Sequence, residues 1–126
     1  MILCCGDALF DIFAEDGASI SNIRLDARVG GSPMNVAIGL SRLGQKSSYL
    51  AKISRDMLGS RMIAHLEHEG VDTSHVILAD NLTTLAIVAL DQEGVATYSF
   101  YTEGTADRSL MESELPAELP APIRVI

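Results

Sequence analysis

A glycine pair directly before a Ser-Pro step is the feature that most constrains the fold of this chain. Residues 28–37 read RVGGSPMNVA. Ser32 suits the N-cap of a helix and Pro33 suits its first turn, because proline fixes a helical φ and lacks the N–H that a helix start leaves unpaired. Apolar residues then recur at helical spacing up to Gly44, a C-cap candidate. The stretch therefore predicts a helix over residues 33–43 that begins at a tight glycine turn.

Short apolar runs on both sides of this helix predict buried parallel strands at residues 2–6 and 47–53. A strand, a helix and a strand in this order form a βαβ unit, which is the building block of α/β folds. A second helical pattern covers residues 57–69, directly after Asp56, and a further short strand is predicted at residues 76–79. The order of these elements predicts an α/β fold.

Two segments interrupt this order and predict a second, antiparallel layer. Residues 18–29 alternate loosely between apolar and polar side chains, which is typical of exposed strands. Within residues 84–101, the apolar runs TLAIVAL and VATYSFY flank DQEG, a hairpin connection with a glycine at its end. We therefore assign an α/β core to residues 1–17, 30–83 and 109–126, and the antiparallel layer to the two segments just named.

The last part of the chain, from Thr102 onward, is acidic and contains three of the four prolines, a composition typical of a linker. Residues 124–126 then read as the opening of another buried strand. A strand that begins there has no helix to complete its βαβ unit. We therefore expect this chain to be the amino-terminal part of a larger fold.

The composition argues against several classes of function. The chain has 126 residues, of which 48% are hydrophobic and 21% charged, as expected for one globular domain. Its formal net charge of -8 and its scattered Lys and Arg residues argue against a nucleic-acid partner. No apolar run approaches the roughly 18 residues of a membrane span, so no membrane partner is expected. The adjacent Cys4 and Cys5 fit a buried strand better than a metal site and agree with a reducing cytoplasm.

Three kinds of ligand are compatible in principle with a glycine turn. A Walker A loop needs Gly-Lys-Ser/Thr after its glycines, which this turn lacks. A dinucleotide-binding turn needs G-x-G-x-x-G directly after the first strand, and Gly30-Gly31 lies well past that strand. A neutral polyol is the third kind. Gly31 lets such a ligand approach the backbone, and Asn35 offers both a donor and an acceptor to a hydroxyl.

A polyol site also needs a carboxylate that accepts hydrogen bonds from hydroxyls. Asp7 or Asp11 can supply it, because open α/β sheets bind ligands beyond the carboxyl ends of their strands. A tight turn and a helix cap without any ligand explain the same residues equally well. Spacing alone does not separate these two interpretations.

Longer stretches of the chain resemble a known family. The stretches GDALFDIFAEDG, RVGGSPMNVAIGLSRLG and KISRDMLGSRMIAHLEHEGVDTSHV resemble the amino-terminal part of the PfkB (ribokinase-like) sugar kinases. The stretch YSFYTEGTADRSL is similar to fructokinase-type members, and the resemblance covers about residues 1–115. It implies a ribokinase-like α/β layer with a small antiparallel β lid, formed by about residues 18–29 and 84–101.

The resemblance also implies the residues of a sugar site. The family's sugar-binding Asp falls on Asp11, its di-glycine turn on Gly30 and Gly31, and its sugar-binding Asn on Asn35. Phe100 is expected as an apolar wall over the sugar, and Arg108 is expected near the substrate. A solvated loop charge is an equally good interpretation of Arg108.

One departure from the family limits the expected activity. The second family signature, Asp-Thr-x-Gly-Ala-Gly-Asp, is absent from this chain. In the family it carries the base that deprotonates the sugar hydroxyl and the anion hole for the phosphoryl group of Mg-ATP. The resemblance therefore implies ATP and Mg²⁺ for a longer enzyme, and no catalysis by these residues alone. A homodimer through the lid or an exposed sheet edge is expected, and a non-catalytic sugar-binding or assembly module is the alternative.

Overall fold

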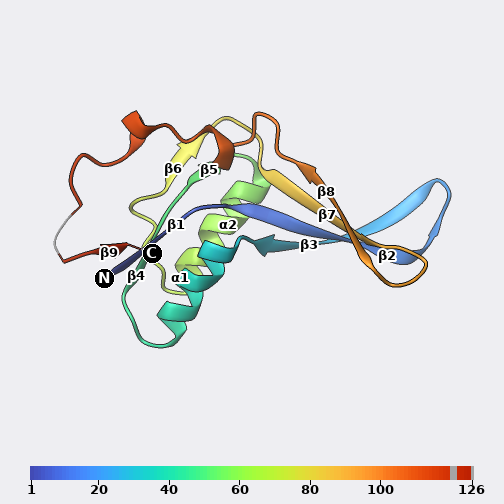
Figure 1. Cartoon of the computed structure of the whole chain (residues 1–126), viewed down its shortest axis with the longest axis horizontal. Coiled ribbons are helices and arrows are strands. Elements are labelled where there is room, and N and C mark those ends of the chain that lie inside the picture. Colours follow the sequence, from blue (N-terminus) through green and yellow to red (C-terminus); the bar gives the residue numbers. More distant parts are fainter. Residues whose placement is uncertain (120–121, 126) are drawn as a thin grey trace.

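Short parallel strands and two helices build one part of the molecule, here called the body, and a separate sheet projects from it (Figure 1). The computed structural model describes residues 1–119 and 122–125, and for residues 16–18 it describes the backbone alone. None of the helices in these residues is long and apolar enough to cross a membrane.

The body contains two small parallel sheets. Strand β1 (Ile2–Cys5) lies between β4 (Ser47–Leu50) and β9 (Arg124–Val125). Strand β5 (Lys52–Ser54) pairs with β6 (Ile77–Ala79). Within β1, Cys4 is buried, as predicted for a buried strand, whereas Cys5 is partly exposed. Both are free thiols.

The strand predicted at residues 47–53 is two strands, because its pairing partner changes at Ala51. The Leu50 carbonyl accepts from the Gly6 N–H at 3.3 Å, next to β1, whereas the Ala51 carbonyl accepts from the Ile77 N–H at 2.9 Å, next to β6. Strand β9 also differs from expectation. It forms at the predicted place, but both of its residues are exposed, whereas β4 at the other edge of the same sheet is buried.

Helices α1 (Ser32–Arg42) and α2 (Met57–His68) lie side by side in the body (Figure 1). The hydroxyl of Ser41 donates to the Glu69 carbonyl at 2.6 Å and joins their ends. Both helices pack apolar side chains against the strands, and the most deeply buried of these are Met34, Ala37, Met62 and Leu66.

The two helix starts differ in how they are capped. The N-cap of α1 is Gly31, and Ser32, predicted as the cap, is already helical and makes no capping bond. Asp56 caps α2 as its position predicts, because its carboxylate accepts from the Gly59 N–H at 2.8 Å.

The projecting sheet has four strands in the order β3-β2-β7-β8, and we call it the lid sheet. Its strands are β2 (Leu9–Ser19), β3 (Asn22–Gly30), β7 (Thr84–Leu90) and β8 (Ala96–Tyr101). Strand β2 is antiparallel to β3 and parallel to β7, and β7 and β8 form the predicted hairpin. The hairpin lies outside the parallel sheets of the body, as predicted.

The boundary predicted between body and lid is wrong at β2. The sequence predicts residues 9–17 in the core, but the chain leaves β1 after Cys5, turns at Gly6 with φ 147, and enters the lid sheet at Leu9. Phe10 and Ile12 explain the error, because these lid residues are buried against the body and give β2 a core-like pattern.

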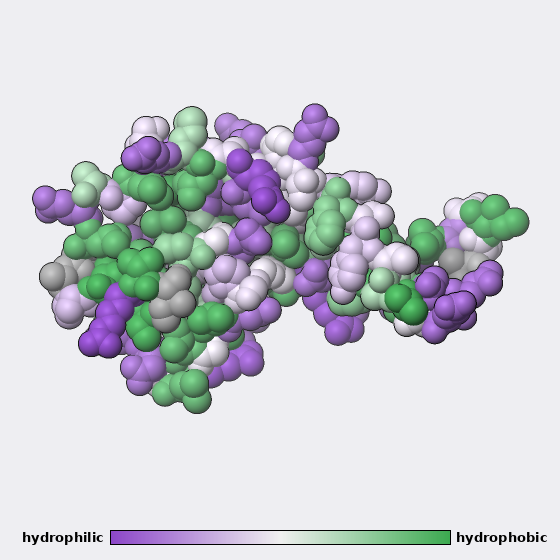
Figure 2. All heavy atoms as spheres, viewed as in Figure 1, coloured by the Kyte–Doolittle hydropathy of each residue, from purple (hydrophilic) through white to green (hydrophobic). Residues whose placement is uncertain are grey.

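Three of the four lid strands meet the body in one row of residues, Gly30, Leu9 and Thr84, here called the root row. Leu9 pairs with Gly30 on one side and with Thr84 on the other, and the neighbouring pair is Leu85 and Tyr101. The far end of the lid sheet is exposed, and Figure 2 shows it as a narrow projection with hydrophobic side chains near its tip, where Ile20 is fully exposed.

After the lid sheet the chain returns to the body through two short 3-10 helices, η1 (Asp107–Ser109) and η2 (Glu112–Glu114). The buried ammonium group of Lys52 fastens them to β5. It donates to the Ser109 carbonyl at 3.1 Å and to both carboxylate oxygens of Glu114, at 2.6 and 2.8 Å.

Candidate functional site

An open groove of about 540 Å³ lies where the lid sheet joins the body. Its floor and walls come from the β1–β2 connection, from β2 and from the first turn of α1. The lining residues are Asp7, Leu9, Asp11, Gly31, Ser32, Asn35 and Val36. The fold thus brings together Asp11, Gly31 and Asn35, which the sequence predicts as one site.

The glycine pair is required by the close approach of this turn to two aspartates. A Cβ atom at Gly30 would lie 2.3 Å from the Asp11 carboxylate, and one at Gly31 would lie 2.4 Å from the Asp7 carbonyl oxygen. Gly31 also has φ 117, which side chains rarely adopt. The glycines therefore let the turn lie directly against Asp7 and Asp11, so that the carboxylate of Asp11 borders the start of α1.

Asp11 and Asn35 face the groove with free hydrogen-bonding capacity. Asp11 is partly exposed on β2 and Asn35 is exposed in the first turn of α1. Neither side chain makes a hydrogen bond or ion pair with the residues that the structure describes. A carboxylate accepts hydrogen bonds and an amide both donates and accepts, so this pair is suited to a ligand with several hydroxyls.

Tyr49 supports the floor of the groove from below. Its hydroxyl donates to the Asp7 carbonyl at 2.5 Å and lies 3.3 Å from the Gly6 carbonyl. Burial, followed by the nearby carboxylates of Asp7 and Asp107, raises the pKa of Tyr49 well above its usual range. The phenol therefore stays protonated and acts as a fixed donor that holds the β1–β2 connection. The sequence does not mark this role, because Tyr49 reads simply as a residue of a buried strand.

The charge of the groove favours neutral ligands over anions. Two carboxylates line it, and no Lys or Arg is among its lining residues. A phosphate group would meet like charges there, which is unfavourable. Within the described ranges, no group of three or more His, Cys, Asp or Glu side chains is arranged to hold a metal ion. These residues therefore fit a polyol, and they offer no basic side chain to the phosphates of a magnesium–triphosphate complex.

Phe100 shares a face of the lid sheet with Asp11. The register pairs Asp11 with Ala86 and Ala86 with Phe100, so the three project from the same side of neighbouring strands. The aromatic ring is 59% exposed, stacks on Tyr98 at a centroid distance of 6.0 Å, and lines a separate groove beside Leu82 and Thr105. Asp11 and Phe100 are thus on one face, two strands apart, with the small Ala86 between them.

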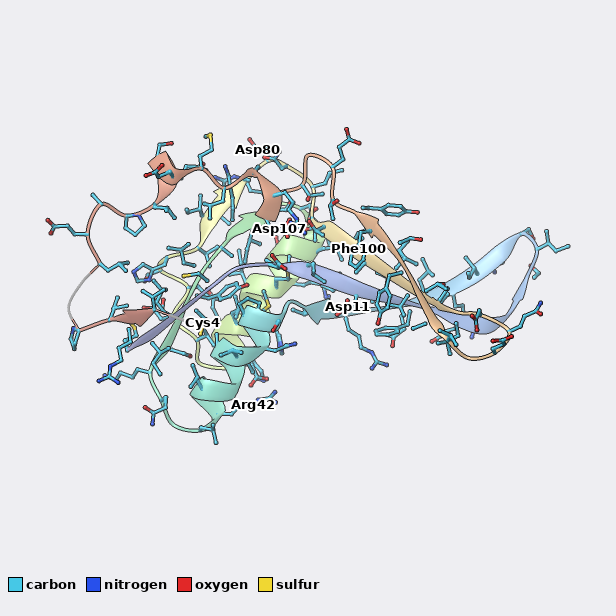
Figure 3. All side chains as sticks on the ribbon, viewed as in Figure 1. Cys4, Asp11, Arg42, Asp80, Phe100 and Asp107 are labelled. Carbon is cyan, nitrogen blue, oxygen red and sulfur yellow. The ribbon has the colours of Figure 1, made fainter. Side chains whose placement is uncertain are left out.

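Arg108 does not reach the groove. It is exposed on η1 and makes no ion pair within the described residues. Its neighbour Asp107 is directed inward instead, toward Thr84 and Thr105 (Figure 3). No local pattern in the sequence marks Asp107, because one of its partners lies 23 residues away.

Comparison with known proteins agrees with this geometry. A family model described as "pfkB family carbohydrate kinase" matches residues 1–125. A fructokinase of Rhizobium leguminosarum bv. trifolii is 38% identical over 116 residues, which are 92% of this chain and 35% of that protein. A 5-dehydro-2-deoxygluconokinase of Clostridium botulinum is 36% identical over 92 residues, which are 71% of this chain and 27% of that protein.

Solved structures give the same result. A fructokinase of Xylella fastidiosa with bound ATP superimposes with a TM-score of 0.84 at 30% identity, over 91% of this chain and 37% of that one. This chain therefore spans about a third of the length of its fructokinase relatives. The match over nearly all of its residues shows that the chain belongs to the pfkB family of carbohydrate kinases.

Proposed function

We propose that this chain provides the sugar-binding part of an ATP-dependent sugar kinase that acts on a fructose-like ketose. The observation that carries the proposal is the groove in which Asp11 and Asn35 face a turn that two glycines keep clear of side chains. Relatives named fructokinase support the choice of sugar, and a relative named 5-dehydro-2-deoxygluconokinase makes an oxidised deoxy sugar acid the competing substrate.

The proposed roles of the groove residues follow from their chemistry. Asp11 accepts hydrogen bonds from sugar hydroxyls, Asn35 donates to one hydroxyl and accepts from another, and the backbone of Gly31 lets the sugar lie close. Phe100 is proposed as an apolar wall, supported by its place on the face that carries Asp11. Arg108 lies outside the groove, so the predicted role near the substrate is not part of this proposal.

ATP with Mg²⁺ is the proposed phosphoryl donor of the longer enzyme, supported by the ATP-bound fructokinase. When bound, it would supply the γ-phosphoryl group that a sugar hydroxyl attacks. The described groove residues do not fit this group, since no Lys or Arg is among them to bind its phosphates. We therefore propose that they bind and orient the sugar and that other residues handle the phosphates.

Titration of the purified chain with D-fructose, followed by NMR, tests the proposal. Asp11→Ala should weaken fructose binding about ten- to a hundredfold, because a hydrogen bond to a charged group is worth roughly 1.5–3 kcal/mol. Asp80→Ala is a matched control, since the Asp80 side chain is 95% exposed on the body. It should leave fructose binding unchanged.

Two results of this titration would count against the proposal. Equal affinity of wild type and Asp11→Ala would remove Asp11 from the site. Binding of the oxidised deoxy sugar acid but not of fructose, with Asp11 still required, would keep the site and replace the substrate.

A second candidate function is assembly through the lid sheet. Exposed aromatic and aliphatic side chains on its outer part favour it, with Tyr98 and Phe100 stacked on each other and Leu90 68% exposed. We propose a homodimer that buries this surface, and light scattering at several dilutions tests it.

We also propose a cytoplasmic location for the protein. The free thiols of Cys4 and Cys5 support it.

A further inference from the structure

Asp107 holds a buried carboxylate oxygen that has no partner. One oxygen, Oδ1, accepts from the hydroxyl of Thr84 and lies 3.2 Å from that of Thr105. The other, Oδ2, is buried and has no hydrogen-bond partner among the described residues. A buried unsatisfied polar atom destabilises the folded state, and charged atoms do so most. Such a cost calls for a physical explanation.

The partner of Asp107 lies at the root row of the lid sheet. Thr84 is the first residue of β7 and is 1% exposed. It pairs with Leu9, which lines the groove, and Leu9 pairs with Gly30 across β3. Gly30 lies against the carboxylate of Asp11. A shift of Thr84 would therefore move the root row and, with it, the part of the groove next to Asp11.

The other side of Asp107 is anchored to the body. The Ala106 N–H donates to the Leu82 carbonyl at 2.9 Å, and Lys52 binds the Ser109 carbonyl. The effect of both Asp107 and Asp7 on the pKa of Tyr49 agrees with a position near the groove floor. Asp107 therefore links a segment fixed on the body to the root row of the lid sheet, and Figure 3 shows it near their junction.

We propose that Asp107 is a positioning residue for the sugar site. Through Thr84 it holds the root row of the lid sheet so that Asp11 faces Asn35 across the groove. The proposal rests on the sugar-binding function proposed above. It explains why a carboxylate with an unpaired oxygen stands here, because its accepting Oδ1 sets the geometry of the lid sheet.

Folding alone does not require this carboxylate. Without it, the hydroxyls of Thr84 and Thr105 remain 2.6 Å apart, and Thr105 still has the Thr102 carbonyl at 2.9 Å. Asp107→Ala thus creates no unpaired donor and removes the unpaired Oδ2. The positioning role predicts a loss of sugar binding without a loss of stability, whereas a purely structural role predicts that both fall together.

The test compares Asp107→Ala, Thr84→Val and Thr84→Ser in the chain. We expect Asp107→Ala and Thr84→Val each to weaken D-fructose binding about tenfold, the size expected for a bond to a charged group. The double variant should lose little more than either alone, because both remove one interaction. Thr84→Ser keeps the hydroxyl and should retain wild-type affinity, as should the control Asp80→Ala.

Hydrogen exchange of the backbone amides gives a readout that needs no sugar. Asp107→Ala should speed exchange in β7 and in the first half of β2, while β1 and β4 keep their protection and the midpoint of denaturant unfolding stays unchanged or rises.

Unchanged exchange in β7 would overturn the positioning role whatever the sugar-binding data are. Faster exchange in β7 with no fructose binding by the wild type would overturn the proposed function and leave the positioning of the lid sheet standing. Wild-type fructose affinity in both Asp107→Ala and Thr84→Val would overturn the inference alone.

Discussion

Strands β4 and β5 are buried along their whole length, whereas every residue of β8 is exposed. In the body, β1 and β4 pack against α1, and β5 packs against α2 and the returning tail. The lid sheet buries only the part nearest the body, including Phe10 and Ile12, and its far part has exposed side chains on β8. The body therefore contains most of the buried strand residues, and the far part of the lid sheet is expected to open more readily than the body.

The largest expected effect tests whether stability resides in the body. Leu66, on α2, is fully buried, and Leu90, at the far end of β7, is 68% exposed. Leu66→Ala should lower the free energy of unfolding by about 2–5 kcal/mol because it leaves a cavity. Leu90→Ala should change it by less than about 0.5 kcal/mol.

Denaturant titration of the two variants measures both values. A loss at Leu90 as large as that at Leu66 would mean that the far part of the lid sheet is covered in solution. Such a result would favour the dimer proposed through this surface.

A smaller effect is expected at Asp56, which ties the body to the start of the lid hairpin. Its carboxylate caps α2 through the Gly59 N–H and accepts from the N–H and hydroxyl of Thr83, at 2.9 and 2.7 Å. Asp56→Ala should cost about 0.5–2 kcal/mol, as the loss of a helix cap does. Burial opposes ionisation of Asp56, but the hydrogen bonds from Gly59 and Thr83 outweigh it and lower its pKa.

The lowered pKa fixes the pH dependence of this effect. A carboxyl group whose pKa is lower in the folded than in the unfolded state stabilises the fold above its unfolded pKa of about 3.9. That stabilisation is lost as the pH falls through the folded pKa. The difference between wild type and Asp56→Ala should therefore be constant at neutral pH and shrink below about pH 4. A difference in the free energy of unfolding that increased as the pH fell would contradict this explanation.

The smallest effect is expected from the ion pair between Arg42 and Glu69, which joins the ends of the two body helices. Two hydrogen bonds of 2.7 Å connect the side chains, and the bond from Arg42 lowers the pKa of Glu69. Because the Arg42 side chain is 65% exposed, the pair contributes little, and Glu69→Gln should shift the unfolding midpoint less than Leu66→Ala or Asp56→Ala does. The shift should diminish further in high salt, and amide exchange in the lid sheet should not change. A change in lid exchange would mean that the two regions are more tightly coupled than their burial indicates.

Local chemistry explains which parts of the fold could be predicted. Helices α1 and α2 follow from apolar spacing with Gly44, Asp56 and Gly70 at their ends, and the β7–β8 hairpin follows from its turn residues. The assignment of β2 to the lid sheet could not be predicted, because Phe10 and Ile12 are buried as core residues are. Burial of these side chains gives β2 an apolar sequence pattern, but such a pattern does not indicate which sheet the strand joins.

The candidate site divides in the same way. Asp11, Gly30, Gly31 and Asn35 carry a local signature, and the fold brings them together. Tyr49 and Asp107 act through contacts with residues far away in the sequence, so only the folded structure reveals them. The packing of η1 directs Asp107 inward and leaves Arg108 exposed. The types of these two side chains alone do not predict that packing.

The single root row has a mechanical consequence. Strand β2 continues for 11 residues from Leu9, a length of about 35 Å, so its far end lies well away from the groove. A tilt of the lid sheet by about 10° about the root row would move the far end of β2 by about 6 Å, while Leu9 and Gly30 would hardly move. A small rotation of the lid sheet near the groove would therefore move Ile20 much farther than the groove residues. A fluorescent or spin probe attached near Ile20 would detect such a rotation on ligand binding more sensitively than a probe in the body.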